Sequence, residues 1–113
     1  MNPIASTPEP PYVAVIFTSL RAARDDAGYA AAATRMEELA SEMPGFLGIE
    51  NARGEDGVGI TVSYWADADA VTAWRTHPEH LDTQASGRHH WYERYELRVA
   101  RVERARSFRS SDG

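Results

Sequence analysis

The sequence predicts a single α+β domain whose elements follow the order strand, helix, strand, strand, broken helix, strand. Its 113 residues suffice for one domain of ordinary size. Apolar residues recur at helical spacing between positions 29 and 43, and they alternate with small or polar ones on both sides of a Gly-bearing turn at 54–57. This order is that of the split βαβ, ferredoxin-like fold with a four-stranded antiparallel sheet.

The first strand is expected directly after a segment without periodicity. Residues 1–11 contain four of the six Pro and are expected to form a flexible tail. Tyr12 to Thr18 is a continuous apolar, β-branched run that is too short for a typical helix and suits a strand covered on both faces. We place the folded domain at residues 12–104, followed by a polar tail at 105–113.

The first helix has the clearest pattern in the chain. Asp25 and Asp26 can cap it, and Pro44-Gly45 ends it. Its apolar face is formed by Tyr29, Ala32, Ala33, Met36, Leu39, Ala40 and Met43.

A hairpin is predicted next, from Phe46–Arg53 and the run 58–65. Leu47 and Ile49 are expected on one face of its first strand. In the second strand the large residues share one face, while the other face carries small residues before Trp65. Such a face leaves free space above it. The two sets are Val58, Ile60, Val62, Tyr64 and Gly59, Thr61, Ser63, Trp65.

The second helical region is expected to be broken. Asp67 or Asp69 can cap a helix over about 67–76, with Val71 and Trp74 on its inner stripe. Pro78 interrupts a helix but is favoured in the first turn of a new one, here 78–86. Leu81 and Ala85 form the inner stripe of that second piece, and Gly87 is expected to end it as a C′ residue.

The last strand is predicted at 91–104. Tyr95, Leu97 and Val99 alternate, but Val102 falls on the other face. Either a bulge intervenes or both faces are partly covered.

Composition excludes several classes of function. The net charge of −5 weighs against nucleic acid and anionic membrane surfaces as partners. The absence of Cys excludes disulfides, thiolate catalysis and Cys-based metal sites. No apolar run approaches a membrane span, and the first residues lack the features of a signal peptide, so a cytoplasmic location is expected.

Rings and titratable groups are concentrated between Tyr64 and Tyr95. This stretch holds all three Trp, three of the five Tyr and all four His. Buried Trp N–H and Tyr O–H groups need polar partners, so a core alone seldom explains such a concentration. We therefore expect this stretch to form the wall of a pocket.

Four motifs resemble the antibiotic biosynthesis monooxygenase family: M-P-G-F-L-G, S-Y-W-A-D, A-W-R-T-H-P-E-H and G-R-H-H-W-Y-E-R-Y. The resemblance covers about residues 12–104. It implies a homodimeric α+β barrel in which two sheets pack face to face and each protomer keeps a pocket between sheet and helices. The family includes cofactor-free oxygenases of aromatic polyketides and haem-degrading enzymes.

The family's functional residues match this chain only in part. The Trp of the polyketide oxygenases corresponds to Trp65, but their Asn and Tyr correspond to Thr61 and Val71. In the haem-degrading branch the Trp corresponds to Trp74, the His falls at Gln84, and the first strand, near Ile16 to Phe17, has no Asn. A haem ligand would then have to be His80, one turn before Gln84.

Cofactor-free oxygenation needs an aromatic slot, a base and a group that holds the phenolate. His80 or His77 is a candidate base, because imidazole titrates near neutral pH, and Arg88 is the candidate for the phenolate. His80, Trp65 and Arg88 are therefore the candidate catalytic residues. The candidate substrate-binding residues are Trp74, His77, Trp91, Tyr92 and Gln84. The expected partners are a small aromatic molecule, O₂ and a second copy of the chain, with no cofactor and no metal.

Plainer roles exist for most of these residues. Trp74 fits the core, Trp91 and Tyr92 could anchor the last strand or a dimer interface, and His77 could be exposed at the helix break. His80 and Gln84 flank the inner stripe and could face solvent or a pocket. His89 and His90 are expected at the surface, and a His77-x-x-His80 metal site is disfavoured because Glu79 lies on the wrong side. Three functions stay open: a monooxygenase, a haem-binding or haem-degrading protein using His80, and a non-catalytic dimeric binding module.

Overall fold

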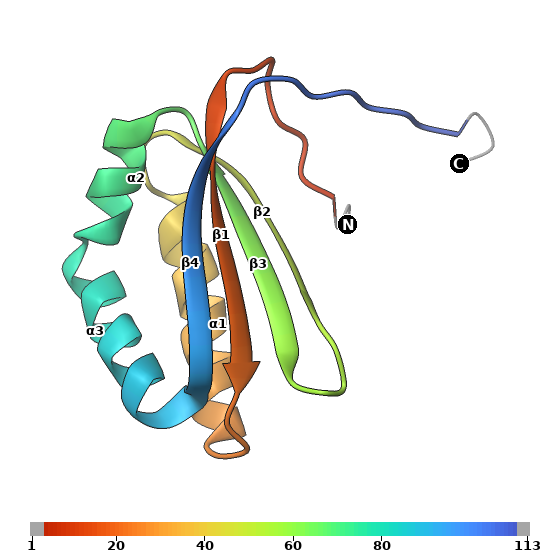
Figure 1. The fold of residues 1–113 in the computed structure, drawn as a ribbon. Coiled ribbons are helices and arrows are strands. Elements are labelled where there is room, and N and C mark those ends of the chain that lie inside the picture. The colour runs from red at the N-terminus through yellow and green to blue at the C-terminus, as the bar shows by residue number, and fades with distance from the viewer. Residues whose placement is uncertain (1–3, 111–113) are drawn as a thin grey trace.

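The computed structural model describes residues 4–110 and confirms the predicted α+β fold (Figure 1). One antiparallel sheet has the strand order β2-β3-β1-β4, which is the ferredoxin-like order. The elements are β1 Tyr12–Arg21, α1 Asp26–Ser41, β2 Phe46–Arg53, β3 Val58–Trp65, α2 Ala68–Arg75, α3 Pro78–Ser86, the π-helical turn η1 Gly87–Trp91, and β4 Tyr92–Val102.

The three α-helices cover one face of the sheet, while both terminal segments run on its other side (Figure 1). The N-terminal segment contacts that second face: the Ala5 N–H donates to Glu50 Oε2 at 3.0 Å, and the hydroxyls of Thr7 and Tyr12 lie 2.8 Å apart. Residues 1–3 lie outside the described part of the chain, and flexibility of the tail stays a prediction. Residues 103–110 form neither helix nor strand.

The strand register places small side chains in the middle of the helix-facing side. Val15 pairs with Ser63, and Phe17 pairs with Thr61. On its other edge, β1 pairs Phe17 with Leu97. On the side that faces the helices, β3 therefore carries the small side chains Thr61 and Ser63, as the alternation in 58–65 predicted, next to Val15 and Phe17 of β1.

The packed core occupies only one end of the space between helices and sheet. Its buried members come from the end of α1, the end of β3 and from α2, and they are Leu39, Ala40, Trp65, Ala70 and Trp74. Gly45, with φ 85°, lets the chain turn there, and a Cβ on it would lie 2.6 Å from the Cβ of Ala70. A core at one end leaves the remaining space between the layers for a cavity.

Two local expectations, for Gly87 and for Leu47, need correction. Gly87 was expected to end the second helical region in a left-handed conformation, but its φ is −59° and the chain continues into η1. A Cβ at position 87 would lie 3.0 Å from Cε2 of the Tyr92 ring, so a larger residue there would have to displace that ring by a few tenths of an ångström. In β2, a register shift between Phe46 and Gly48 puts Phe46, and not Leu47, against the core.

The register at the end of β4 settles the question of Val102. Val102 pairs with Tyr12 on the face away from the helices, and the pairing is continuous from there back to Arg94. The only irregularity in this pairing lies between Leu20 and Arg21. Both faces of β4 therefore carry apolar side chains, and no bulge lies between Arg94 and Val102.

An ion pair on the surface joins the first helix to the third. Arg35 Nε donates to Glu79 Oε2 at 2.6 Å, and Arg35 Nη2 donates to Glu79 Oε1 at 3.1 Å. These hydrogen bonds raise the pKa of Arg35 and lower the pKa of Glu79. Within residues 4–110, no helix has the length and hydrophobicity needed to cross a membrane. The cytoplasmic location stays a prediction.

Candidate functional site

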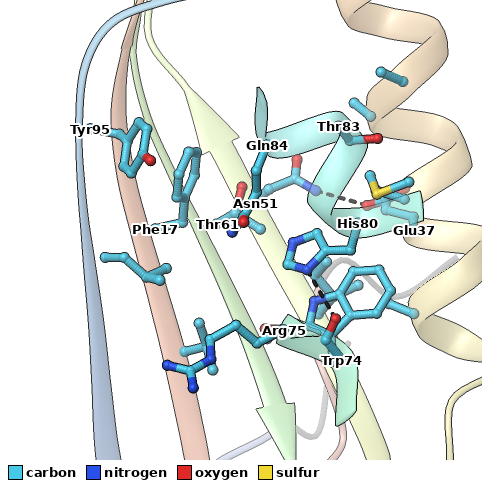
Figure 2. Close-up of a pocket in the computed structure, with 18 of the residues that line it drawn as sticks. Phe17, Glu37, Asn51, Thr61, Trp74, Arg75, His80, Thr83, Gln84 and Tyr95 are labelled. Carbon is cyan, nitrogen blue, oxygen red and sulfur yellow. Dashed lines mark hydrogen bonds between the residues drawn. The ribbon is translucent and has the colours of Figure 1, made fainter. Parts of the chain in front are cut away.

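A cavity of about 540 Å³ lies between the sheet and the helices. This volume is in the range of small-molecule sites in proteins. Its walls are mostly apolar and aromatic, with Phe17, Trp74 and Tyr95 among them, and a few polar side chains reach into it. Figure 2 shows these side chains converging from the strands on one side and from α1, α2 and α3 on the other.

A stack of three rings supports one wall of the cavity, and two of them, Trp74 and His80, line that wall. Trp65 and Trp74 stack with their centroids 5.8 Å apart, and Trp74 and His80 stack at 4.2 Å with only 15° between their planes. Phe46 meets the far side of Trp65 edge-on at 5.5 Å. The helix break at Pro78 makes this possible, because it lets His80 turn back onto the end of α2.

Trp65 is the innermost ring of this stack and is fully buried. Its exposed fraction is 0 %, and its Nε1–H donates to Ser63 Oγ at 2.9 Å. Trp65 is absent from the cavity wall, whereas Trp74 belongs to it. Trp65 therefore does not line the space in which a ligand would bind. The Trp74 ring lies between Trp65 and His80 and stacks on both.

His80 presents one unprotonated nitrogen to the cavity. Its Nδ1 lies 3.0 Å from the backbone oxygen of Trp74, and a carbonyl oxygen only accepts, so Nδ1 carries the proton. The neutral imidazole then has a bare Nε2, which receives no hydrogen bond within residues 4–110. Figure 2 shows this edge of the ring facing the sheet, toward Thr61. Burial lowers the pKa of His80 below 6.5, so the neutral form prevails at pH 7.

Polar side chains meet across the middle of the cavity. Asn51 on β2 pairs in register with Thr61 on β3, and its Nδ2 donates to Glu37 Oε1 at 3.0 Å. Thr83 and Gln84 approach from α3 on the other side (Figure 2). The carboxylate of Glu37 fixes the orientation of the Asn51 amide, which is left with one free N–H.

A group of phenols and guanidiniums closes one end of the cavity. The rings of Tyr29 and Tyr92 meet edge-on at 5.9 Å. Burial, together with the neighbouring Tyr29, raises the pKa of Tyr92, so that phenol stays protonated. Arg53 Nη2 donates to the hydroxyl of Tyr29 at 3.1 Å, and the Arg21 guanidinium lies 4.0 Å from the centre of the Tyr29 ring.

Trp91 both lines this end and anchors the last strand. Its Nε1–H donates to Asp25 Oδ2 at 3.0 Å, and its backbone oxygen accepts from the Ala22 N–H at 2.8 Å and Arg21 Nη1 at 2.7 Å. The hydrogen bond that Trp91 Nε1–H donates to the Asp25 carboxylate lowers the pKa of Asp25. Asp25 is the N-cap of α1 and has a φ of 51°. Trp91 thus lies in the cavity wall and also ties the start of β4 to the loop before α1, and its role toward a ligand stays a prediction.

The cavity contains five of the residues that the sequence singled out, namely Trp74, His80, Gln84, Trp91 and Tyr92. It does not contain His77 or Arg88. His77 Nδ1 accepts from the Glu79 N–H at 3.2 Å and caps α3. Arg88 lies in a neighbouring depression that shares Tyr92 and Tyr95 with the cavity wall, and its Nη1 is 3.4 Å from the Tyr95 hydroxyl. The functional roles of all these residues stay predictions.

Several cavity residues were missed by the sequence reasoning. Phe17, Asn51 and Arg53 come from strands outside the ring-rich stretch. A signal existed for two of them, because Asn51 and Arg53 continue the alternation of Ile49 toward the same face. Tyr29 was assigned to the inner stripe of the first helix, but nothing in that pattern indicated a cavity.

The described residues contain no cluster of three or more His, Asp or Glu side chains suited to a metal ion. His77 and His80 both lie near the Trp74 ring, at centroid distances of 6.4 and 4.2 Å, but Nδ1 of His77 accepts from the Glu79 N–H and Nδ1 of His80 lies 3.0 Å from the Trp74 backbone oxygen.

Comparisons with known proteins agree with the fold. A family model described as antibiotic biosynthesis monooxygenase matches residues 11–86. The chain is 50 % identical over 111 residues to the uncharacterized protein YqjZ of Bacillus subtilis (strain 168), covering 98 % of this chain and 96 % of YqjZ.

Solved structures show the same arrangement at low sequence identity. SnoaB, a cofactor-independent oxygenase from Streptomyces nogalater, aligns with a TM-score of 0.72 at 16 % identity, covering 85 % of this chain and 97 % of SnoaB. A conserved protein from Methanosarcina mazei aligns with a TM-score of 0.73 at 7 % identity, covering 82 % and 94 %. Fold, family model and relative agree, and the chain belongs to the antibiotic biosynthesis monooxygenase family.

Proposed function

We propose that the protein is a cofactor-independent monooxygenase that oxidises a phenolic or polyketide-like aromatic molecule. The observation that carries this proposal is the bare Nε2 of His80, which faces a cavity with aromatic walls. The structural likeness to SnoaB, an oxygenase described as cofactor-independent, supports it at the level of the fold.

The proposed reaction begins with a proton transfer from the phenol to His80 Nε2. The electron-rich phenolate then passes one electron to O₂, and the resulting radical pair combines at a ring carbon to form a hydroperoxide. Loss of water leaves a quinone, so one oxygen atom enters the product and the other leaves as water. For 1,5-dihydroxynaphthalene the balance is C₁₀H₈O₂ + O₂ → C₁₀H₆O₃ + H₂O. The aromatic substrate supplies all the electrons, and no external reductant is needed.

The protein's own contribution is a base, a slot and an anion-stabilising donor. His80 is a suitable base because burial keeps it neutral at pH 7 and Trp74 fixes its tautomer. Stacking against Trp74 and contact with Phe17 would orient the aromatic ring. The sequence assigned the phenolate to Arg88, which lies outside the cavity. Within the cavity, the amide N–H groups of Asn51 and Gln84 are candidate donors to the phenolate.

A homodimer is part of this proposal. The sheet face away from the helices exposes large apolar side chains, with Val58 at 43 % and Ile60 at 47 %. A contiguous apolar sheet face of this kind favours burial against a second copy. Sedimentation equilibrium should give twice the mass of the chain for the wild type, and Ile60→Glu should shift the protein toward the monomer. A monomeric wild type would contradict the dimer.

Oxygen uptake tests the reaction. The wild type should consume one O₂ per 1,5-dihydroxynaphthalene or anthrone in buffer containing a metal chelator, and ¹⁸O₂ should label one oxygen of the product. His80→Gln should slow the reaction by about 100-fold or more, since a positioned base contributes roughly 10²–10⁴-fold. His89→Gln, at the exposed surface, is the matched control. Equal rates for wild type and His80→Gln would refute the role of His80.

The same nitrogen makes haem binding the second candidate. An imidazole with a protonated Nδ1 and a bare Nε2 is suited to iron ligation, and His80 would hold the haem iron, which would supply the O₂ chemistry. Titration with haemin should then give a Soret band that His80→Gln abolishes. A protein that binds aromatic probes but neither takes up O₂ nor binds haem would instead be a non-catalytic binding module.

A further inference from the structure

We infer that Arg53 forms an anion subsite in the cavity, so that the bound molecule carries a carboxylate beside its aromatic rings. This inference rests on the proposed function for one point, that the ligand is aromatic. It narrows the substrate class to aromatic molecules that carry an acidic group. It comes from the contacts of one guanidinium.

Arg53 has a positive charge without a negative partner. Among residues 4–110, ion pairs to carboxylates involve Arg21, Arg35 and Arg94. Two arginines line the cavity, Arg53 and Arg75, and neither forms an ion pair within that range; Arg53 is the one that hydrogen bonds hold against the sheet. Arg53 donates only to neutral oxygens: from Nη1 to the Gly57 backbone oxygen at 2.5 Å, and from Nη2 to Ser19 Oγ at 2.9 Å and the Tyr29 hydroxyl at 3.1 Å. Since a guanidinium has five N–H donors, two remain for a ligand.

The backbone around Arg53 is shaped to hold this side chain against the sheet. Arg53 pairs with Gly59 on β3, and Gly59 pairs with Ser19 on β1. The guanidinium crosses β3 at Gly59, where a Cβ would lie 2.4 Å from its Cζ. Ser19, which is buried, receives it on the other side. Glycine at 59 therefore permits a close approach that any other residue would obstruct.

Neighbouring acidic groups do not supply the missing charge. Tyr92 stays a neutral phenol because burial raises its pKa. Glu37, the carboxylate among the cavity residues, accepts from Asn51 and forms no ion pair with Arg53 within the described chain. The second guanidinium near Tyr29, that of Arg21, is already paired with Asp26. A carboxylate on the ligand is the natural partner, because guanidinium and carboxylate match in charge and in hydrogen-bonding geometry.

The subsite would also orient the ligand. Arg53 belongs to the sheet layer and His80 to the helical layer of the same cavity. A molecule whose carboxylate binds Arg53 and whose ring lies against Phe17 extends through the cavity toward His80. The acidic group would thus determine which ring position reaches the base.

Two fluorescent probes of nearly equal shape test the inference. 8-Anilinonaphthalene-1-sulfonate carries an anion, and N-phenyl-1-naphthylamine is the same ring system without it. The wild type should bind the sulfonate more tightly, with an affinity that falls as salt is added. Arg53→Gln should weaken the sulfonate about 10-fold or more and change the uncharged probe by less than about 2-fold. 2-Naphthoate should displace the sulfonate at lower concentration than 2-naphthamide does.

Gly59→Ala is the second variant, because it keeps the charge but obstructs the path of Arg53. It should weaken the sulfonate selectively as well, while Arg94→Gln, exposed and outside the cavity, should leave both probes unchanged. Circular dichroism melting checks that each variant is folded. The inference is overturned if Arg53→Gln binds both probes as the wild type does, or loses both equally. Because no turnover is involved, an absence of O₂ uptake would refute the proposed function and leave this result standing.

Discussion

The two ends of the cavity are built by different means. At one end, Trp65, Trp74 and His80 are held by ring packing, with Trp65 fully buried. At the other end, Arg53 is held by directional hydrogen bonds to Ser19 and Tyr29, next to the exposed β2–β3 turn. Ring packing holds the side chain of His80 in one position. The Arg53 side chain is long, and its hydrogen bonds to Ser19 and Tyr29 can be replaced by hydrogen bonds to a ligand. The first arrangement suits a base that must not move, and the second suits recognition.

The largest effect is expected from substitution of Trp65, the fully buried ring of the stack. Trp65→Ala should lower the free energy of unfolding by about 3–5 kcal/mol, because it empties a fully buried site that Phe46 and Trp74 both contact. Urea unfolding measures this loss. Trp65→Phe is the matched control and should cost clearly less, since most of the ring contact is kept. A loss below about 1 kcal/mol for the alanine variant would show that the stack does not stabilise the fold.

At the Arg53 end of the cavity, substitution should change ligand binding more than stability. Arg53→Gln should change the free energy of unfolding by less than about 1 kcal/mol, because its hydrogen bonds lie at an exposed turn, yet it should lose selectivity for the anionic probe. Both quantities come from the same preparation, by urea unfolding and by probe fluorescence. If Arg53→Gln destabilised the protein as much as Trp65→Ala, the distinction between a packed end and a recognition end would be wrong.

The smallest expected effect is on the pH dependence of stability. The pKa of His80 is lowered by burial, so below about pH 6.5 the unfolded chain binds a proton that the folded chain resists. The free energy of unfolding should therefore fall as the pH drops from 7 to 5.5. In His80→Gln this slope should be shallower, as measured by urea unfolding at both pH values. An unchanged slope would mean that His80 titrates normally.

The fold was predictable because each element has its own local signal. The hairpin, the kink at Pro78 and the cap at Asp67 all follow from neighbouring residues. The right-handed conformation of Gly87 was not predicted, because the chain continues into η1 and packs position 87 against the Tyr92 ring, a contact that local sequence does not encode.

The site was predictable only in part, because periodicity gives a side chain's face and not its depth. Trp65 on β3 and Trp74 on α2 both point into the space between sheet and helices, yet only Trp74 belongs to the cavity wall. Arg88 was assigned to the pocket from its position beside ring residues, but it follows the start of a π-helical turn and lies outside the cavity wall. Arg53 was missed because its importance depends on the pairing of β2, β3 and β1 across Gly59.

The central claim is that His80 is neutral at pH 7, with its proton on Nδ1 and a bare Nε2 facing the ligand. Nitrogen-15 NMR of histidine-labelled protein measures this directly, with His80→Gln used to assign the signal. The account predicts an Nδ1–H tautomer that titrates below pH 6.5 and an Nε2 signal that shifts when 2-naphthol is added. A proton on Nε2, or an imidazolium at pH 7, would contradict it.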